Sequence, residues 1–283
     1  MIVVLIVLLL ILLWAVGWAI WISRRRAKTQ VLITPADYQL QAQTVSLRTT
    51  DGVDIEGWFL PHPHATKTVI LVHGFGMNKG EMLKRTHFLA LSYNLLYLDC
   101  RGAGESSGHS EAGLQESKDI QAAVDYLRTV HPSLAQEMAL YGISMGAAAA
   151  AYYTATHGGI KCLVLEASYY SFKNVVKRWI WKHAKIPYFP LVTLFVYWKE
   201  LMLKRKVESF ALQQTASQIT CPVLMIQGEK DKLAPVSKAQ KTYHLLSGPK
   251  ELWIVPQAGH ASCYQFGGEA YVKKITQFFQ TNL

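Results

Sequence analysis

A serine between two glycines is the first feature of this sequence that could do chemistry. The segment Gly142-Ile143-Ser144-Met145-Gly146 matches G-x-S-x-G, and it lies between an apolar, strand-like run (138–143) and a helix-period stretch (145–157). In such a turn the serine projects from the carboxyl end of the strand, and small neighbours let the strand and helix pack closely. The sequence therefore predicts that Ser144 is a nucleophile. A tight turn with an incidental serine is the alternative.

A serine nucleophile needs two partners. Serine reacts poorly until a base takes its proton, and the base needs an acid to orient it. After a strand–turn–helix nucleophile, the acid comes next along the chain and the histidine last. Asp231 lies in a polar loop after the apolar run 222–226, and His260 ends the loop after the run 251–255. We therefore expect Asp231 and His260 to form a catalytic triad with the serine.

Other residues could fill these roles. Glu166 directly follows an apolar run, and Glu229 precedes Asp231 by two residues, so both are alternative acids. His73 also directly follows an apolar run and could be taken for the base. Its position immediately after a strand favours a structural role in the loop.

Two backbone amides are candidates to hold the negative oxygen that forms on an acyl substrate. Gly74 and Gly76 flank Phe75 and permit a turn that points amides inward, so we expect the Phe75 N–H to donate there. The N–H of Met145, in the first helical turn after the serine, is the second expected donor. We also expect Gly74 and Gly76 to line the substrate site.

The elements that must position these residues alternate between strands and helices. Residues 43–49 and 53–60 alternate in polarity around Asp51-Gly52, which predicts a β-hairpin. Continuous apolar runs typical of strands covered on both faces follow at 68–72, 94–98, 138–143, 160–165, 222–226 and 251–255. Helix-period stretches lie near 79–91, 114–130, 145–157, 236–246 and 268–280. This order predicts an α/β fold with a mostly parallel central sheet flanked by helices.

The N-terminus has a different character. Residues 2–22 contain no charged residue and are long enough to cross a bilayer, and Arg24–Arg26 and Lys28 follow directly. Ala15-Val16-Gly17 could be a signal-peptide cleavage site, but signal peptides carry their charge before a shorter apolar run. We therefore expect residues 1–28 to be an uncleaved transmembrane helix with a basic flank. The positive-inside rule then puts residues 29–283 in the cytoplasm, on a single-pass protein of the cell membrane.

An insertion of about residues 168–213 separates the sixth and seventh predicted strands. It mixes aromatic residues with many lysines and arginines, in a chain whose formal net charge is +10. One interpretation is an ordinary helical cap whose aromatic side chains are buried and whose lysines are solvated. The other is a cap that touches the bilayer and admits a lipid or acylated substrate, because aromatic and basic residues together suit an anionic lipid surface.

The whole set of motifs resembles the α/β-hydrolase superfamily. The motifs are HGFG at 73–76, LDCRGAGESSG at 98–108, GISMG at 142–146, GEKDKLAP at 228–235 and AGH at 258–260, and the likeness spans about residues 43–283. A short membrane anchor before such a domain is similar to the Bem46-like serine hydrolases. The resemblance implies hydrolysis of an ester, thioester or amide without metal or cofactor. Phe75 departs from the pattern of many lipases, which have a third glycine there, and this argues against large branched alcohol esters.

Other functions stay open at this point. The same fold supports peptidases and acyltransferases, and a membrane-tethered adaptor without activity could retain it. Nucleic-acid binding is suggested only by the basic charge, and the sequence contains no recognition motif. The four cysteines, Cys100, Cys162, Cys221 and Cys263, form no CxxC pair, which favours small buried thiols over a disulfide framework or a metal site.

Overall fold

The computed structural model describes residues 29–185 and 188–283, together with single positions at 2, 6, 10, 13, 14 and 17. The predicted transmembrane helix of residues 1–28 lies almost entirely outside the described residues. Among the residues that are described, no helix is both long and apolar enough to cross a membrane.

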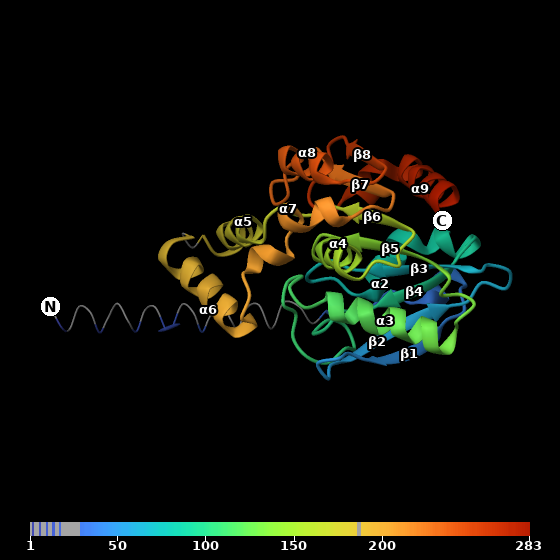
Figure 1. Cartoon of the computed structure of the whole chain (residues 1–283), viewed down its shortest axis with the longest axis horizontal. Coiled ribbons are helices and arrows are strands. Elements are labelled where there is room, and N and C mark those ends of the chain that lie inside the picture. Colours follow the sequence, from blue (N-terminus) through green and yellow to red (C-terminus); the bar gives the residue numbers. More distant parts are fainter. Residues whose placement is uncertain are drawn as a thin grey trace.

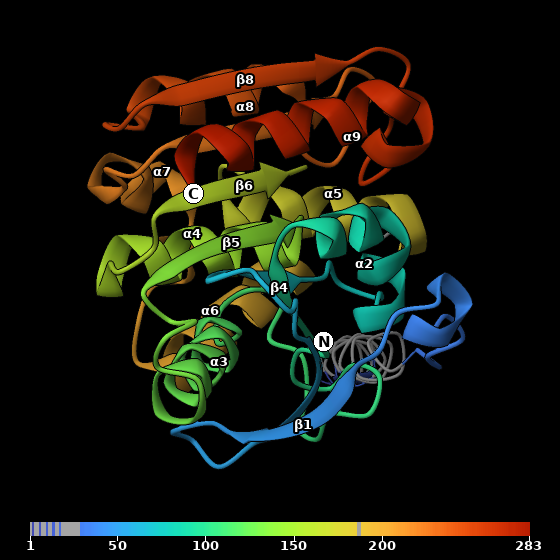
Figure 2. The same cartoon turned by 90° about the vertical axis from the view of Figure 1, so that its right-hand side faces the viewer.

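Within these residues, one eight-stranded sheet forms the centre of the molecule (Figures 1 and 2). Its strands lie in the order β1-β2-β4-β3-β5-β6-β7-β8. Their bounds are β1 (Gln43–Arg48), β2 (Asp54–Leu60), β3 (Lys67–Val72), β4 (Asn94–Leu98), β5 (Glu137–Ile143), β6 (Cys162–Glu166), β7 (Val223–Gly228) and β8 (Lys250–Val255). Strand β2 is antiparallel to β1 and β4, and the other neighbouring pairs are parallel. The predicted hairpin and mostly parallel sheet are confirmed.

Helices cover both faces of the sheet. Helices α3 (Ser117–Val130), α4 (Met145–His157) and α8 (Val236–Leu245) contribute buried side chains to the core on one face. Helices α2 (Lys79–Thr86) and α9 (Cys263–Asn282) contribute to the core on the other face, and Figure 2 shows them on the same side of the sheet. The central strands are buried on both faces, which explains their continuous apolar runs.

Several helix ends differ from the predicted ones, most clearly in α2 and α9. The expected helix over 79–91 ends at Thr86, because the backbone of that residue departs from helical geometry (φ −134°), and a 3₁₀ helix continues over His87–Leu91. The expected helix over 268–280 begins earlier, at Cys263, and is interrupted at Gly268, whose φ is +49°.

The insertion between β6 and β7 forms a separate helical layer. It contains α5 (Phe172–Ala184), a π-helical turn at Tyr188–Val192, α6 (Thr193–Leu203) and a 3₁₀ turn at Val207–Phe210, and it leads into α7 (Leu212–Thr215). Its inward-facing side chains form a third apolar cluster with residues of α4 and of the loop after β4. Figure 1 shows α5 and α6 extending beyond the body of the domain on one side.

Candidate active site

Ser144 lies on a sharp turn between β5 and α4, near the middle of the sheet. Its φ of +52° and ψ of −107° are outside the regions that non-glycine residues ordinarily adopt. The turn persists because its neighbours fix it: the Ser144 N–H donates to the carbonyl of Glu166, and the Ser144 carbonyl accepts from Ala148. Strain of this kind is concentrated at functional sites.

The two glycines of the turn are required by close backbone packing. A Cβ on Gly142 would lie 2.4 Å from the carbonyl oxygen of Gly146, and one on Gly146 would lie 2.2 Å from that of Val72. Strand β5, helix α4 and the end of β3 therefore meet here without room for a methyl group. This contact accounts for the small residues on both sides of Ser144.

Three side chains from distant parts of the chain meet at this turn. His260 Nε2 lies 2.8 Å from Ser144 Oγ, and His260 Nδ1 lies 2.8 Å from Asp231 Oδ2. An ionised carboxylate can only accept, so Nδ1 carries a proton and donates it to Asp231. In the neutral imidazole Nε2 is then the acceptor for the Ser144 hydroxyl. The carboxyl ends of β5, β7 and β8 thus bring the three predicted residues together.

The carboxylate of Asp231 is buried and held in place from several sides. Oδ1 accepts from the backbone N–H groups of Leu233 and Ala234, at 2.8 and 2.9 Å. Oδ2 accepts from the Gln227 side-chain amide, at 2.9 Å, in addition to His260. The same Gln227 amide donates to the Ala234 carbonyl. These bonds leave the carboxylate one orientation, in which it fixes the tautomer of His260.

The loop after β3 lies directly against the turn that carries Ser144. A Cβ built on Gly74 would be 3.5 Å from Cβ of Ser144, and Gly76 has a φ of +74°, in the left-handed region that favours glycine. The carbonyl of Gly74 is 2.8 Å from His73 Nδ1 and accepts from the N–H of Met77. In a trans peptide the C=O and the next N–H point in opposite directions. The Phe75 N–H is therefore directed away from His73 and Met77.

Met145 is the first residue of α4. The first N–H groups of an α-helix have no intrahelical acceptor, and the helix dipole adds a partial positive charge there. The loop after β3 and the start of α4, which carry the two predicted donor residues Phe75 and Met145, thus both adjoin Ser144.

His73 braces the loop and is fully buried. Its Nε2 accepts a hydrogen bond of 2.9 Å from the N–H of Cys100, so Nδ1 carries the proton and donates to the Gly74 carbonyl. Burial lowers the pKa of His73 below its ordinary value of 6.5, although the nearby carboxylates of Asp99 and Glu116 act in the opposite direction. The imidazole connects the chain just after β3 with the chain just after β4, and both of its nitrogens bind backbone groups. The predicted structural role of His73 in the loop is therefore confirmed.

The pH dependence of stability should report on this histidine. The unfolded chain binds a proton at the ordinary pKa of 6.5, whereas the folded chain binds it only at lower pH. The contribution of His73 is therefore complete above pH 6.5 and is lost as the pH falls, by up to about 1.4 kcal/mol per pH unit. Urea unfolding of the full chain in mild detergent at pH 7.5 and 5.5 measures this loss. The loss should be smaller in His73→Gln, and an equal loss in both proteins would contradict the assignment.

The alternative acids are engaged elsewhere. Glu166 is fully buried, and its Oε2 accepts hydrogen bonds of 2.8 Å from the hydroxyls of Tyr141 and Tyr271. Glu229 is exposed and accepts from the backbone N–H of Gln257. Between the three candidates, only Asp231 contacts His260 in the structure.

The insertion lies across the rim of this site. The ring of Trp179 on α5 packs edge-on against Phe75, with 5.8 Å between ring centroids. Arg178, also on α5, donates to the carbonyl of Leu233, in the loop that holds Asp231. On α6, Lys199 forms an ion pair with Glu111 in the loop after β4. The insertion thus contacts the loops after β3, β4 and β7, which surround Ser144.

The sequence did not predict two residues that hold the loops of the site, Gln227 and Glu116. Gln227 is a polar residue near the end of the otherwise apolar strand β7, and its side chain donates to Asp231. A polar residue at that position in the sequence could have indicated a role at the carboxyl edge of the sheet. Glu116 has no comparable signal: its buried carboxylate accepts from Ser110 and from the backbone N–H groups of Glu111 and Gly113. It shapes the loop that carries the partner of Lys199.

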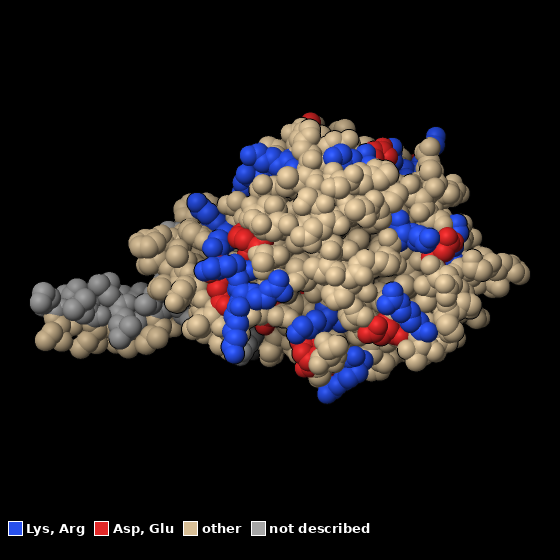
Figure 3. Space-filling view, in the orientation of Figure 1, with Lys and Arg blue, Asp and Glu red and all other residues tan. Residues whose placement is uncertain are grey.

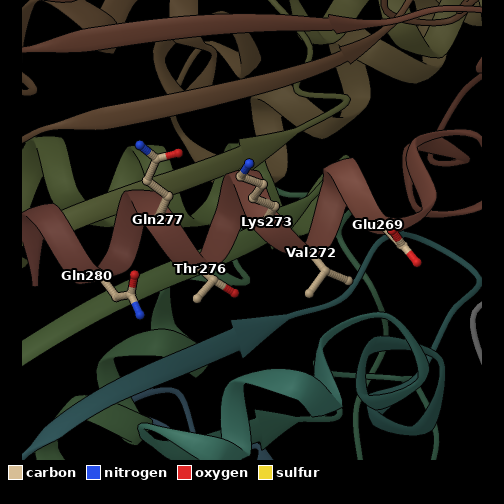
Figure 4. Close-up of a pocket in the computed structure, with 6 residues that line it drawn as sticks. All are labelled: Glu269, Val272, Lys273, Thr276, Gln277 and Gln280. Carbon is tan, nitrogen blue, oxygen red and sulfur yellow. The ribbon is translucent and has the colours of Figure 1, made fainter.

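A surface pocket lies apart from these loops. It is lined by residues of α9 alone, namely Glu269, Val272, Lys273, Thr276, Gln277 and Gln280 (Figure 4). None of them belongs to the loops that carry Ser144, Asp231 and His260. The pocket is a shallow depression on one helix face, and it does not belong to the candidate active site.

Known proteins resemble this chain over most of its length. A family model described as serine aminopeptidase, S33, matches residues 63–196. The protein bem46 of Schizosaccharomyces pombe is 28% identical over 260 residues, which cover 88% of this chain and 80% of bem46. The uncharacterized membrane protein YNL320W of Saccharomyces cerevisiae is 26% identical over 80% of this chain and 76% of its own length.

A solved structure extends this likeness to the fold. The esterase Pf2001 of Pyrococcus furiosus superposes with a TM-score of 0.75 at 25% sequence identity, over 90% of this chain and 98% of the esterase. The sheet order and the flanking helices indicate the same fold as the comparisons do. The chain therefore has the α/β-hydrolase fold and is similar to Bem46 and to the esterase Pf2001.

Proposed function

We propose that the protein is a membrane-anchored serine hydrolase that cleaves an ester or thioester of a lipid or acylated substrate. The observation that carries the proposal is the continuous hydrogen-bonded chain from Ser144 through His260 to Asp231, with 2.8 Å at each step. This arrangement activates a serine for attack on an acyl carbonyl. A small-molecule acyl ester is the substrate class that the esterase neighbour favours.

The proposed reaction proceeds through an acyl-enzyme. His260, oriented by Asp231, removes the proton from Ser144 as the serine oxygen attacks the acyl carbonyl. The amides of Phe75 and Met145 hold the resulting oxyanion, and each such donor contributes about 3 kcal/mol. His260 then protonates the leaving alcohol or thiol. A water molecule, activated by the same imidazole, attacks the acyl-enzyme and releases the acid. No step requires a metal or cofactor.

The proposed domain organisation places this chemistry at the cytoplasmic face of the cell membrane. Residues 1–28 form the anchor with its basic flank, residues 29–283 form the hydrolase domain, and residues 168–213 form its cap. The apolar run 2–22 followed by Arg24–Arg26 and Lys28 supports the anchor and its orientation. The relative YNL320W, described as a membrane protein, also favours membrane association.

Activity-based labelling tests the nucleophile and the membrane topology together. In intact cells a membrane-permeant fluorophosphonate should label the protein, and the label should be recovered in the membrane fraction. A charged, impermeant fluorophosphonate should label it only after the cells are broken, because the site faces the cytoplasm. Failure of both reagents in broken cells would contradict a serine hydrolase. Labelling of intact cells by the impermeant reagent would contradict the cytoplasmic orientation. Recovery of the labelled protein in the soluble fraction would contradict the membrane anchor.

A peptidase is the second candidate, and it is favoured by one observation. The family model that matches residues 63–196 is described as a serine aminopeptidase. An ester, a thioester and an amide with the same acyl group, compared in one assay, separate the two functions. Preference for the amide would favour the peptidase, and transfer of the acyl group to an added alcohol would favour an acyltransferase.

A further inference from the structure

The cap helix α6 has an apolar stripe on its outer face. Leu194, Tyr197, Trp198, Leu201 and Met202 recur at spacings of three and four residues, so they share one side of the helix. Each of these side chains is between 41 and 65% exposed. Large apolar side chains that are gathered in this way, rather than scattered singly, mark an interaction surface.

The opposite face of the same helix is already used in packing. Val192, just before α6, and Val196 within it are buried in the apolar cluster of the cap, and Lys199 is paired with Glu111. The helix is therefore fixed with one apolar face inward and a second one outward. Trp181 on α5 and Phe189 in the turn before α6 are further exposed aromatic residues of the insertion.

Positive charge surrounds this outer surface. The insertion of residues 168–213 contains nine lysines and arginines but only two acidic residues, both glutamates. The segment before Thr29 adds four basic residues and no acidic residue, whereas the rest of the chain has 16 basic and 17 acidic residues. The net charge of +10 is thus confined to the insertion and the N-terminal flank. Figure 3 shows a band of Lys and Arg side chains over the part of the molecule where α5 and α6 lie.

The first residues of the described domain, 29–33, lie at the same edge of the sheet. The Asn78 side chain, which caps α2 directly after the loop of Phe75, donates to Thr29 Oγ1 and to the Gln30 carbonyl. Gly80 is packed so closely on Ile33 that a Cβ there would lie 2.3 Å from its carbonyl oxygen. The chain that follows the predicted anchor is therefore attached at the carboxyl edge of the strands, where the cap also lies.

We propose that the outer face of α6, together with Trp181 and Phe189, docks on the surface of a bilayer that contains anionic lipid. The apolar stripe enters the interface between headgroups and acyl chains, and the surrounding lysines contact lipid phosphates. The anchor holds the domain at the membrane, so these weak contacts act at high effective concentration. Docking in this way depends on the cap surface and does not depend on hydrolysis.

Nitroxide accessibility in the full chain tests the proposal. A spin label is attached at Met202→Cys, or at Leu91→Cys as the control, in protein reconstituted into nanodiscs. Cys221→Ser removes the half-buried cysteine, and the other three cysteines are buried. Leu91 is 80% exposed and precedes β4, at the amino edge of the sheet. In discs of phosphatidylcholine with phosphatidylglycerol, collisions with a water-soluble nickel chelate should fall several-fold at position 202 and stay unchanged at position 91.

Two comparisons identify the cause of such protection. Replacement of Lys182, Lys185 and Lys204 by glutamine should restore accessibility at position 202. The matched replacement of Lys84, Lys161 and Lys241, which are also exposed but lie outside the insertion, should leave the protection intact. The proposal is overturned if position 202 stays as accessible as position 91, or if it is equally protected in discs of phosphatidylcholine alone. Protection that instead rises with protein concentration in detergent would assign this face to a second copy of the chain.

Discussion

Ser144→Ala should abolish turnover of an activated ester while the protein stays folded. Loss of the nucleophile from a serine–histidine–aspartate arrangement typically lowers kcat by about 10⁴- to 10⁶-fold, and the remaining rate comes from binding and the oxyanion donors alone. The substitution removes one hydroxyl and its bond to His260 Nε2, and the backbone bonds of residue 144 to Glu166 and Ala148 remain. The loss should therefore appear in kcat and leave the unfolding transition almost unchanged.

The measurement pairs ester hydrolysis with covalent labelling. Ser144→Ala should show neither hydrolysis above background nor labelling by a fluorophosphonate. Ser92→Ala is the matched control, because Ser92 is an exposed serine that precedes β4, at the far edge of the sheet, and it should keep both activities. Hydrolysis or labelling that persists in Ser144→Ala would show that another residue is the nucleophile.

Asp231→Asn should have the second largest effect. An amide side chain at this position presents a donor to His260 Nδ1 and favours the wrong tautomer, a change that lowers kcat by about 10⁴-fold where it has been made in a serine protease. The carboxylate is surrounded by donors: two backbone N–H groups, the Gln227 amide and His260. The variant should thus lose kcat much more than affinity for the substrate.

Glu166→Gln provides the matched carboxylate control. It replaces a buried carboxyl group at the same edge of the sheet with an amide, and the hydrogen bonds that it changes are those from Tyr141 and Tyr271. We expect a lower free energy of unfolding, by about 1–3 kcal/mol, and a rate within about tenfold of the parent, because neither the base nor the nucleophile is touched. If Glu166→Gln lost the activity and Asp231→Asn kept it, the assignment of the acid would be reversed.

Local patterns were sufficient to predict most of the framework. Periodicity and turn residues predict the strand and the helix on either side of Ser144. They also predict where the parallel strands occur along the chain and which loops carry Asp231 and His260. These features depend on neighbours within one element, which a single sequence contains. The ends of helices were less predictable, as at Thr86 and Cys263, because tertiary packing sets them.

The choice among similar residues required the tertiary structure. Glu166 ends β6, Glu229 and Asp231 follow β7, and only the geometry of the sheet edge decides which of them reaches His260. His73 and His260 both lie in loops after strands, yet one is buried between backbone groups and the other faces the serine. Contacts between loops more than a hundred residues apart depend on strand order and twist, which no local pattern encodes.

The cap shows the same division between sequence and structure. Its sequence indicated aromatic and basic residues together, but it could not separate the buried side chains from the exposed ones. Helix α6 is apolar on two faces, so periodicity alone does not say which face packs inward. The positions of Val192 and Val196 against the core settle the orientation and leave Leu201 and Met202 in solvent. The sequence determined the elements and the candidate chemistry, and the tertiary structure determined which side chains meet and which face outward.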